Sequence, residues 1–215
     1  ERSILNPLFP ASGGSRALIG HFIPALIFGA LAEVMPDQLM AGTGSPLWCV
    51  NLAGVKPDGK SFANLFFFNG GMGANYQSDG QNCMSWPSNI SSTPTEVIEQ
   101  LAPMRIHRRG FLPNSGGEGR YRGGLGQEVE FEFLNETPAA LAMLAERTKH
   151  SAPGIAGGGE GSLGRLELNG EAVDPKAQHI VKKGDRLLIA TPGGGGYGRL
   201  QDRDDADKSR DAILE

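Results

Sequence analysis

The sequence predicts a β-rich α+β fold with hairpins, Gly-rich loops and one N-terminal helix. Three observations predict this class. One apolar stretch near the N-terminus has the length of a helix, several short apolar segments are separated by turn residues, and glycine accounts for 32 of the 215 residues. Ordinary proteins contain roughly 7% glycine. Because the glycine clusters follow no fixed interval and alternate with apolar segments, collagen and low-complexity disorder are poor explanations.

The helix is expected over about residues 16–35. Ser15 can cap its first turn, Pro24 would kink it and Pro36 would end it. The apolar part of this segment, 17–32, is shorter than the roughly 20 residues that a membrane span needs. We therefore expect a buried helix and no membrane span.

Strands make up most of the remaining chain. The apolar runs 47–55 and 61–68 flank Lys56-Pro57-Asp58-Gly59-Lys60, a turn sequence that predicts a hairpin. A short helix is expected at 95–101. A strand is expected to follow at 104–112.

The second half of the chain continues this pattern. Segment 127–134 alternates acidic with apolar residues, which is typical of a strand with one solvated face. Ala, Leu and Met at 139–145 favour a helix, but the short length of this segment and its neighbours favour the strand that we expect there. An Asn-Gly pair predicts a hairpin over 165–173. We expect another hairpin over 179–190 and a frayed helix or disordered tail over 201–215.

We expect one folded body over residues 1–198 and a charged tail over 199–215. The formal net charge of −4 gives no electrostatic footprint for nucleic acid. Cys49 and Cys83 lie in no paired motif, which favours a reducing cytosol over a disulfide scaffold. The four histidines are far apart and lack metal-ligand spacing, so a metal site built wholly from this segment is not the favoured hypothesis.

Two phosphate-binding patterns occur in unsuitable contexts. Residues 54–61 match the P-loop, and residues 159–164 match the dinucleotide fingerprint. Both motifs must open a helix whose amides face the phosphate groups. Since a hairpin is expected at each place, we favour structural turns over nucleotide binding.

Asp79, Arg120 and Arg122 are the candidate site residues. Arg120 and Arg122 lie two apart in a glycine-rich run, so on an extended backbone they would point to the same side and grip a carboxylate or phosphate. The alternative is a structural pairing with Glu118 or Glu128.

Asp79 lies in a polar segment, 70–95, and loops of that length usually bind or cover something. Its carboxylate can serve as a ligand, as a general base or in an Asx-turn. Glu146-Arg147, after an apolar run, would place charges at a strand end where clefts form. Internal ion pairing is the alternative for that pair.

Several groups of residues form an ordered set of motifs that extends to about Gly198. They are Asn6-Pro7 with Pro10-Ala11, 29–32 with Pro36, 70–74 with Asp79-Gly80, 93–96, Asn114 to Gly126, Glu146-Arg147 with Pro153-Gly154, and Thr191 to Gly198. In this order they resemble the B-type subunit of hydantoinases, the matching C-terminal half of 5-oxoprolinases and the related α subunit of acetone carboxylase. Asn114 stands where that family often has Asp.

The resemblance implies the C-terminal segment of a hydantoinase B-like subunit that is not active as this segment alone. Such a subunit would hydrolyse a cyclic amide, hydantoin or 5-oxoproline, with an A-type subunit that uses ATP, in a cytoplasmic oligomer. A divalent metal would belong to an N-terminal portion that has no counterpart in these 215 residues. Asp79, Arg120 and Arg122 would contact the substrate or shape its cleft. The alternatives are a non-catalytic assembly module and a carboxylase subunit for a small ketone.

Overall fold

Two antiparallel sheets form one half of the computed structural model, which describes residues 8–11, 16–56 and 58–214. The first sheet has the order β2-β1-β5-β8, and the second has the order β3-β4-β9-β6-β7. The first contains β1 (Trp48–Val55), β2 (Ser61–Phe68), β5 (Ala139–Leu144) and β8 (Gln178–Val181). The second contains β3 (Met104–Phe111), β4 (Gln127–Phe133), β6 (Arg165–Leu168), β7 (Glu171–Ala172) and β9 (Arg186–Ala190). The predicted β-rich α+β class is confirmed.

The two sheets share one apolar core. The alternation in β4 places Val129, Phe131 and Phe133 in this core, each with 0% of its surface exposed. The rings of Phe68 on β2 and Phe131 meet edge to face with their centroids 5.4 Å apart, so this contact joins the two sheets. Burial of one such side chain contributes about 1.5–3 kcal/mol. The fold is therefore a sandwich, and the period-2 pattern of β4 correctly indicates which of its side chains lie inside.

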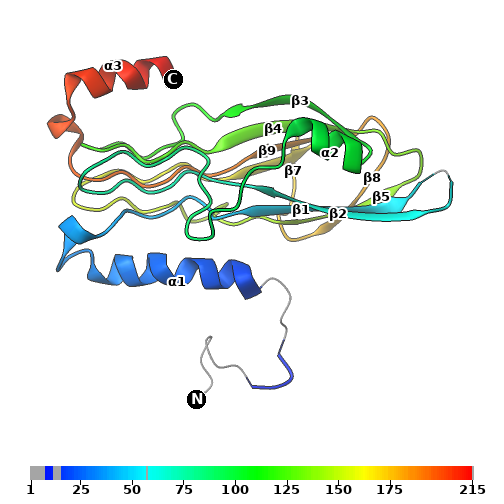
Figure 1. Ribbon diagram of the computed structural model, residues 1–215, viewed down its shortest axis with the longest axis horizontal. Helices are drawn as coiled ribbons and strands as arrows, with labels where there is room; N and C mark the ends of the chain where they lie inside the picture. Colours follow the sequence, from blue (N-terminus) through cyan, green and yellow to red (C-terminus); the bar gives the residue numbers. More distant parts are fainter. Residues whose placement is uncertain (1–7, 12–15, 57, 215) are drawn as a thin grey trace.

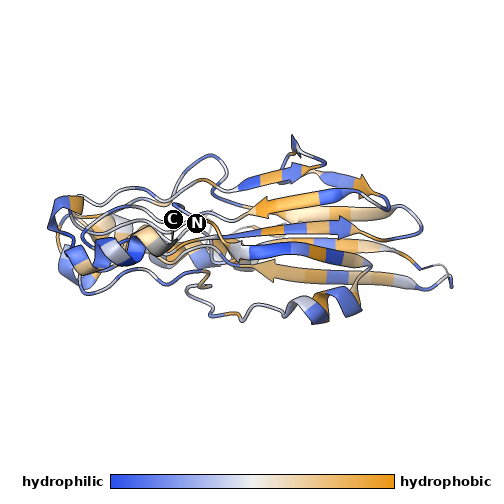
Figure 2. Ribbon diagram, turned by 90° about the horizontal axis from the view of Figure 1, so that it is seen from above, coloured by the Kyte–Doolittle hydropathy of each residue, from blue (hydrophilic) through white to orange (hydrophobic). Residues whose placement is uncertain are grey.

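Glycine-rich segments continue the strands beyond one end of the sandwich as extended chains (Figure 1). Figure 2 shows the same elongated shape, with alternating hydropathy in the strands on the right and pale segments on the left. We call these segments the glycine bundle. It consists of residues 40–46, 69–82, 112–126, 152–164 and 191–198.

Residues 191–198 form the centre of the glycine bundle, and all eight are buried. The amides of Gly194, Gly195 and Gly196 donate to the carbonyl oxygens of Gly124, Gly42 and Gly159, at 2.9, 2.8 and 2.9 Å. These acceptors belong to three different segments, whereas a sheet gives a strand at most two neighbours in one plane. Glycine is required at this packing distance, because a Cβ at Gly194 would overlap the carbonyl oxygen of Met72.

Three α-helices occur among the described residues. α1 (Arg16–Leu31) and α3 (Asp205–Leu214) lie on opposite sides of the glycine bundle, and α2 (Thr95–Leu101) lies beside β3 (Figure 1). Two 3-10 turns, η1 (Pro36–Gln38) and η2 (Leu200–Asp202), complete the helical elements.

α1 ends at Leu31, one turn before the predicted end at residue 35. Pro36 disfavours the helical backbone at the residue before it, and it opens η1 instead. Ser15, the expected cap, lies outside the described residues. A frayed helix or a disordered tail was expected over 201–215. The described residues of this segment include the helix α3.

The hairpin predicted over 179–190 is wrong. β8 pairs with β5, while β9 pairs with β4 and β6, so the connection crosses from one sheet to the other. Asp185 fixes this crossing, since its carboxylate accepts hydrogen bonds from the Lys182 amide at 2.8 Å and from Asn169 Nδ2 at 3.0 Å. A short turn between two strands favours a hairpin locally, but the apolar faces of the two sheets decide which strands pair.

The other strand predictions are confirmed. β1 pairs with β2, as the predicted hairpin requires, and β6 pairs with β7 around Asn169-Gly170. Gly59 has a φ of +81°, which suits a turn, and β2 rather than a helix follows the P-loop pattern. α2 and strands β3, β4 and β5 also lie where they were predicted, to within one residue at their ends.

Candidate functional site

Asp79 lies in the glycine bundle and is held by three hydrogen bonds. Its Oδ1 accepts from the backbone N–H of Arg122 at 2.7 Å and from Nη1 of Arg203 at 2.8 Å. Its Oδ2 accepts from Nη2 of Arg203 at 2.8 Å. Burial opposes ionisation, but the hydrogen bonds from Arg203 and Arg122 outweigh it and lower the pKa of the Asp79 carboxyl. A carboxylate in this state is a poor general base, so we assign Asp79 to ordering the loop.

Arg203, between η2 and α3, joins the carboxylates of Asp79 and Asp211. Its side chain is only 2% exposed, and its Nε donates to Oδ2 of Asp211 at 2.6 Å. Its Nη1 also donates to the carbonyl of Arg120 at 3.0 Å. The hydrogen bond to Asp79 raises the pKa of this guanidinium, despite its burial, and Asp211 adds to the effect. The buried charge is thus compensated on two sides.

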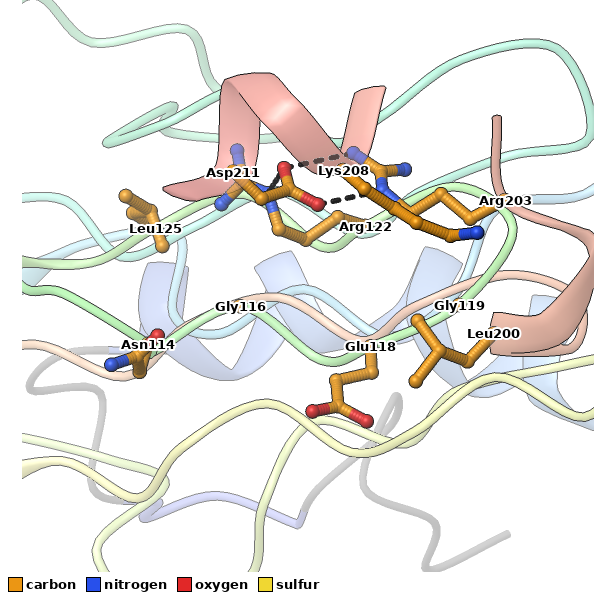
Figure 3. Close-up of a pocket in the computed structure, with 10 residues that line it drawn as sticks. All are labelled: Asn114, Gly116, Glu118, Gly119, Arg122, Leu125, Leu200, Arg203, Lys208 and Asp211. Atoms are coloured by element: carbon orange, nitrogen blue, oxygen red, sulfur yellow. Dashed lines mark hydrogen bonds and ion pairs between the residues drawn. The ribbon is translucent and has the colours of Figure 1, made fainter. Parts of the chain in front are cut away.

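Arg122 shares the Asp211 carboxylate with Arg203. Its Nε donates to Oδ1 of Asp211 at 3.1 Å, and its side chain is 14% exposed. Its Nη1 is buried and has no hydrogen-bond partner among the described residues. Figure 3 shows Arg122, Arg203 and Asp211 at one edge of a cavity of about 420 Å³. The cavity is also lined by Asn114, Gly116, Glu118, Gly119, Leu125, Leu200 and Lys208.

Arg120 does not join Arg122 at this cavity. It is exposed, its guanidinium lies over the neighbouring tyrosine ring, and it lines a different cavity. Neither arginine forms an ion pair with Glu118 or Glu128 among the described residues, and Asp211 is the partner of Arg122 instead. The structure therefore brings Asp79 and Arg122 together through a backbone hydrogen bond and leaves Arg120 apart.

A second polar cluster lies where β5 ends, as expected for Glu146-Arg147. Burial raises the pKa of Glu146 to about 7, against the opposing charges of Lys176 and Arg147. Its Oε2 is buried and unpartnered among the described residues. Arg147 donates through Nη1 to the Ser151 carbonyl at 2.8 Å. No hydrogen bond or ion pair joins Glu146 to Arg147 in the described part of the chain, so the alternative of internal pairing is not found.

A larger cavity of about 780 Å³ lies between α1 and the first sheet. Its walls are mainly apolar, with His21, Cys49 and Lys176 among the lining residues. Burial, and next the charge of Glu146, raises the pKa of the Cys49 thiol to about 11. Since the thiolate is the nucleophilic form, this cysteine is not set up as a nucleophile.

Sequence reasoning missed Arg203 and Asp211. Both lie in the segment expected to be a charged tail, and Arg203 is 124 positions from Asp79. The sequence signal for these two residues was the presence of charges of both signs in that segment. Such a pattern does not identify partners as distant in the chain as Asp79.

The described residues contain no cluster of three or more His, Cys, Asp or Glu side chains placed to hold a metal ion. None of the helices in the described ranges combines the length and apolarity that crossing a bilayer requires.

The fold and site define a class of protein, a β-sandwich extended by a glycine bundle with an arginine–carboxylate cluster between the bundle and α3. The family model described as Hydantoinase B/oxoprolinase matches residues 1–200. The chain therefore belongs to the hydantoinase B/oxoprolinase family.

Three proteins illustrate the relationship. The putative B-type subunit of a D-/L-hydantoinase from Pseudomonas sp. (strain NS671) is 28% identical over 214 residues, which cover 94% of this chain and 35% of that protein. The crystal structure of the ATP-dependent caprolactamase from Pseudomonas jessenii gives a TM-score of 0.70 at 25% identity, covering 86% of this chain and 34% of that one.

The nucleotide-free acetone carboxylase structure gives a TM-score of 0.72 at 18% identity, covering 90% of this chain and 32% of that one, and it supports the fold alone. The chain spans about a third of the length of the hydantoinase subunit that it matches. The predicted family resemblance is confirmed.

Proposed function

We propose that the chain is part of an ATP-dependent cyclic amidohydrolase that opens a hydantoin, 5-oxoproline or similar ring together with an A-type subunit. The observation that carries this proposal is the family match over residues 1–200. The similarity to an ATP-dependent caprolactamase supports the use of ATP, and the similarity to the B-type subunit of a hydantoinase supports a partner chain.

In the proposed reaction the A-type subunit uses ATP to phosphorylate the ring carbonyl oxygen, and the ring opens on the B-type side. Activation is needed because water attacks an unactivated amide slowly, and each 1.4 kcal/mol removed from the barrier gives about a tenfold gain in rate. A divalent metal, if used, would be bound outside this segment.

The residues of this chain have narrower roles in the proposal. Asp79 holds the backbone amide of Arg122 in place and does not act as a base, since its pKa is lowered. Arg122, with its buried and unpartnered Nη1, faces the cavity of Figure 3 and is the residue for contact with an anionic group. Arg120, which is exposed elsewhere, shapes the surface beside α3.

The test is ATP-dependent turnover. The protein is copurified with an A-type subunit and supplied with ATP and a panel of hydantoin, 5-oxoproline and caprolactam, and phosphate release and ring opening are measured. Ring opening coupled to phosphate release is expected. Absence of turnover over the whole panel contradicts the hydrolase assignment, and turnover that requires bicarbonate and a small ketone favours the carboxylase alternative.

The second candidate is a non-catalytic assembly module, and the exposed side of α1 and the turn after it favours it. Leu26 and Val34 are 70% and 81% exposed, and Ile19, Ile27 and Leu31 are between 39% and 51% exposed. A helix that is apolar on nearly all sides is usually buried against a partner. If Leu26→Gln with Ile27→Gln prevents copurification while Arg122→Gln leaves both copurification and turnover intact, the chain assembles the enzyme without contributing to the chemistry.

A further inference from the structure

Two guanidinium groups converge on a single carboxylate at the edge of the cavity in Figure 3. Arg122 Nε and Arg203 Nη2 donate to Oδ1 of Asp211 at 3.1 and 2.9 Å, and Arg203 Nε donates to Oδ2 at 2.6 Å. Three directed donors from two nearly buried arginines are the arrangement by which proteins recognise a carboxylate. We call Arg122 and Arg203 the arginine cradle.

The helix that supplies Asp211 is weakly attached. Most side chains of α3 are exposed, and only Asp207 and Asp211 of residues 205–212 are half-buried. The other ion pairs of α3, Lys208 with Asp205 and Arg210 with Asp207, lie within the helix. Among the hydrogen bonds and ion pairs of the described residues, those of Asp211 alone connect α3 to the arginine cradle and the glycine bundle. A helix held in this way, with little apolar burial, is displaced at low cost once another carboxylate replaces that of Asp211 on the two arginines.

The guanidinium of Arg203 and the backbone of Arg122 stay in place without Asp211. Arg203 is fixed from its other edge by both oxygens of Asp79 and by the carbonyl of Arg120. Arg122 has its backbone amide bound to Asp79. Withdrawal of Asp211 would therefore leave the fixed guanidinium of Arg203 and the released side chain of Arg122 at a cavity of about 420 Å³, a volume that accommodates a molecule of amino-acid size.

We propose that the arginine cradle is a binding site for a small carboxylate, and that α3 is its displaceable cover, with the Asp211 carboxylate occupying the site in this structure. The expected ligand is an amino-acid-sized carboxylate, the chemical class that hydrolysis of a cyclic amide produces. That this ligand is a product of ring opening rests on the proposed function. That the arginine cradle binds a carboxylate does not depend on it.

The test is calorimetric titration with L-glutamate, which is ring-opened 5-oxoproline. Asp211→Ala is expected to bind glutamate at least tenfold more tightly than the unaltered protein, because the internal competitor is gone. Asp207→Ala is the matched control on the same helix and should bind like the unaltered protein. Adding Arg122→Gln to Asp211→Ala should abolish the gain while leaving the Arg203–Asp79 pair in place.

The proposal is overturned if Asp211→Ala binds no more tightly, if Asp207→Ala gives the same gain, or if the gain survives Arg122→Gln. Hydrogen exchange on the unaltered protein provides a second readout that needs no variant. Saturating glutamate should accelerate exchange of the α3 amides, whereas chloride at equal ionic strength should not. Equal effects of the two anions, or no effect of either, also overturn it. Since neither measurement requires turnover, failure of the enzymatic assay and failure of this site are distinguishable.

Discussion

Arg203 is the residue on which the charge balance of the site depends. It is 2% exposed, and the carboxylates of Asp79 and Asp211 that it joins are 33% and 18% exposed. Removing one partner of a buried ion pair leaves charge uncompensated and costs about 3–5 kcal/mol. The carboxylates here retain some solvent, so the lower end of that range applies.

Arg203→Met is therefore expected to lower the free energy of unfolding by about 3 kcal/mol, because both carboxylates lose their main partner. Urea denaturation at neutral pH measures the effect. The control is Arg199→Met, whose exposed pair with Asp202 predicts a change within about 0.5 kcal/mol. Equal effects of the two substitutions would refute the structural importance of the buried cluster.

Glu146 is expected to make stability depend on pH in the opposite direction from a salt-bridged carboxylate. Its pKa is raised from 4.5 to about 7 in the folded protein, mainly by burial. The folded state therefore binds the proton more tightly than the unfolded state. The corresponding stability is fully present below pH 4.5 and is lost as pH rises through about 7.

Glu146→Gln should remove this dependence. At pH 8 the variant is expected to be more stable than the unaltered protein by up to about 3 kcal/mol, and the difference should shrink toward pH 5. Urea denaturation from pH 5 to 8 measures it, with Glu171→Gln at an exposed site as the control. A constant difference across this range would rule out the raised pKa.

At the residue scale the sequence singled out Asp79 and Arg122 as candidates and left both a ligand-contacting and a structural role open. In the structure the carboxylate of Asp79 binds the backbone of Arg122 and the side chain of Arg203. Which partners meet across 43 and 124 positions depends on the route of the glycine bundle, and no local pattern encodes that route.

At the scale of elements, the glycine bundle depends on backbones that lie closer than side chains allow. Gly194 illustrates this at the centre of the bundle, where the carbonyl of Met72 occupies the position of a Cβ. Gly110 in β3 has open space at the same position. A comparison of substitutions at Gly194 and Gly110 therefore shows whether close backbone packing is what requires glycine.

Gly194→Ala is expected to lower the free energy of unfolding by about 3 kcal/mol, because two backbone segments must move apart. Gly110→Ala should change it by less than about 1 kcal/mol and in the stabilising direction, since alanine restricts the unfolded chain. Denaturant midpoints of the two variants give the comparison. If both are tolerated equally, close packing is not what requires glycine in the bundle.

The element-scale predictions succeeded where the pattern was local. The alternation of β4 and the Asn169-Gly170 turn contain their own signals, because burial of one face and positive φ are properties of a few adjacent residues. The predicted pairing of β8 with β9 failed, and β8 pairs with β5, since two short strands joined by a turn are compatible with either sheet.

At the scale of the whole molecule, the sandwich and the glycine bundle are connected through many chain crossings. Strands β1, β2, β3, β4, β6 and β9 lead directly into or out of the bundle, so neither half can unfold without releasing the ends of the other. We therefore expect one cooperative unit that includes both halves and excludes α3.

Native-state hydrogen exchange tests this expectation, because it measures the free energy of opening at each amide. The amides of residues 191–198 and of β4 should exchange with the same free energy, equal to that of global unfolding, and the amides of α3 should exchange with a much smaller one. A lower free energy for 191–198 than for β4 would mean that the two halves unfold separately.

The sequence by itself determined the family, the β-rich class, most strands and the places where glycine is needed, because these follow from periodicity, turn chemistry and ordered motifs along the chain. Only the tertiary structure decided that the strands form a sandwich, that the glycine segments join in a bundle, and that α3 brings Asp211 to Arg122 and Arg203. The physical reason is that packing and charge compensation act between residues far apart in the chain, whose meeting depends on the folded path.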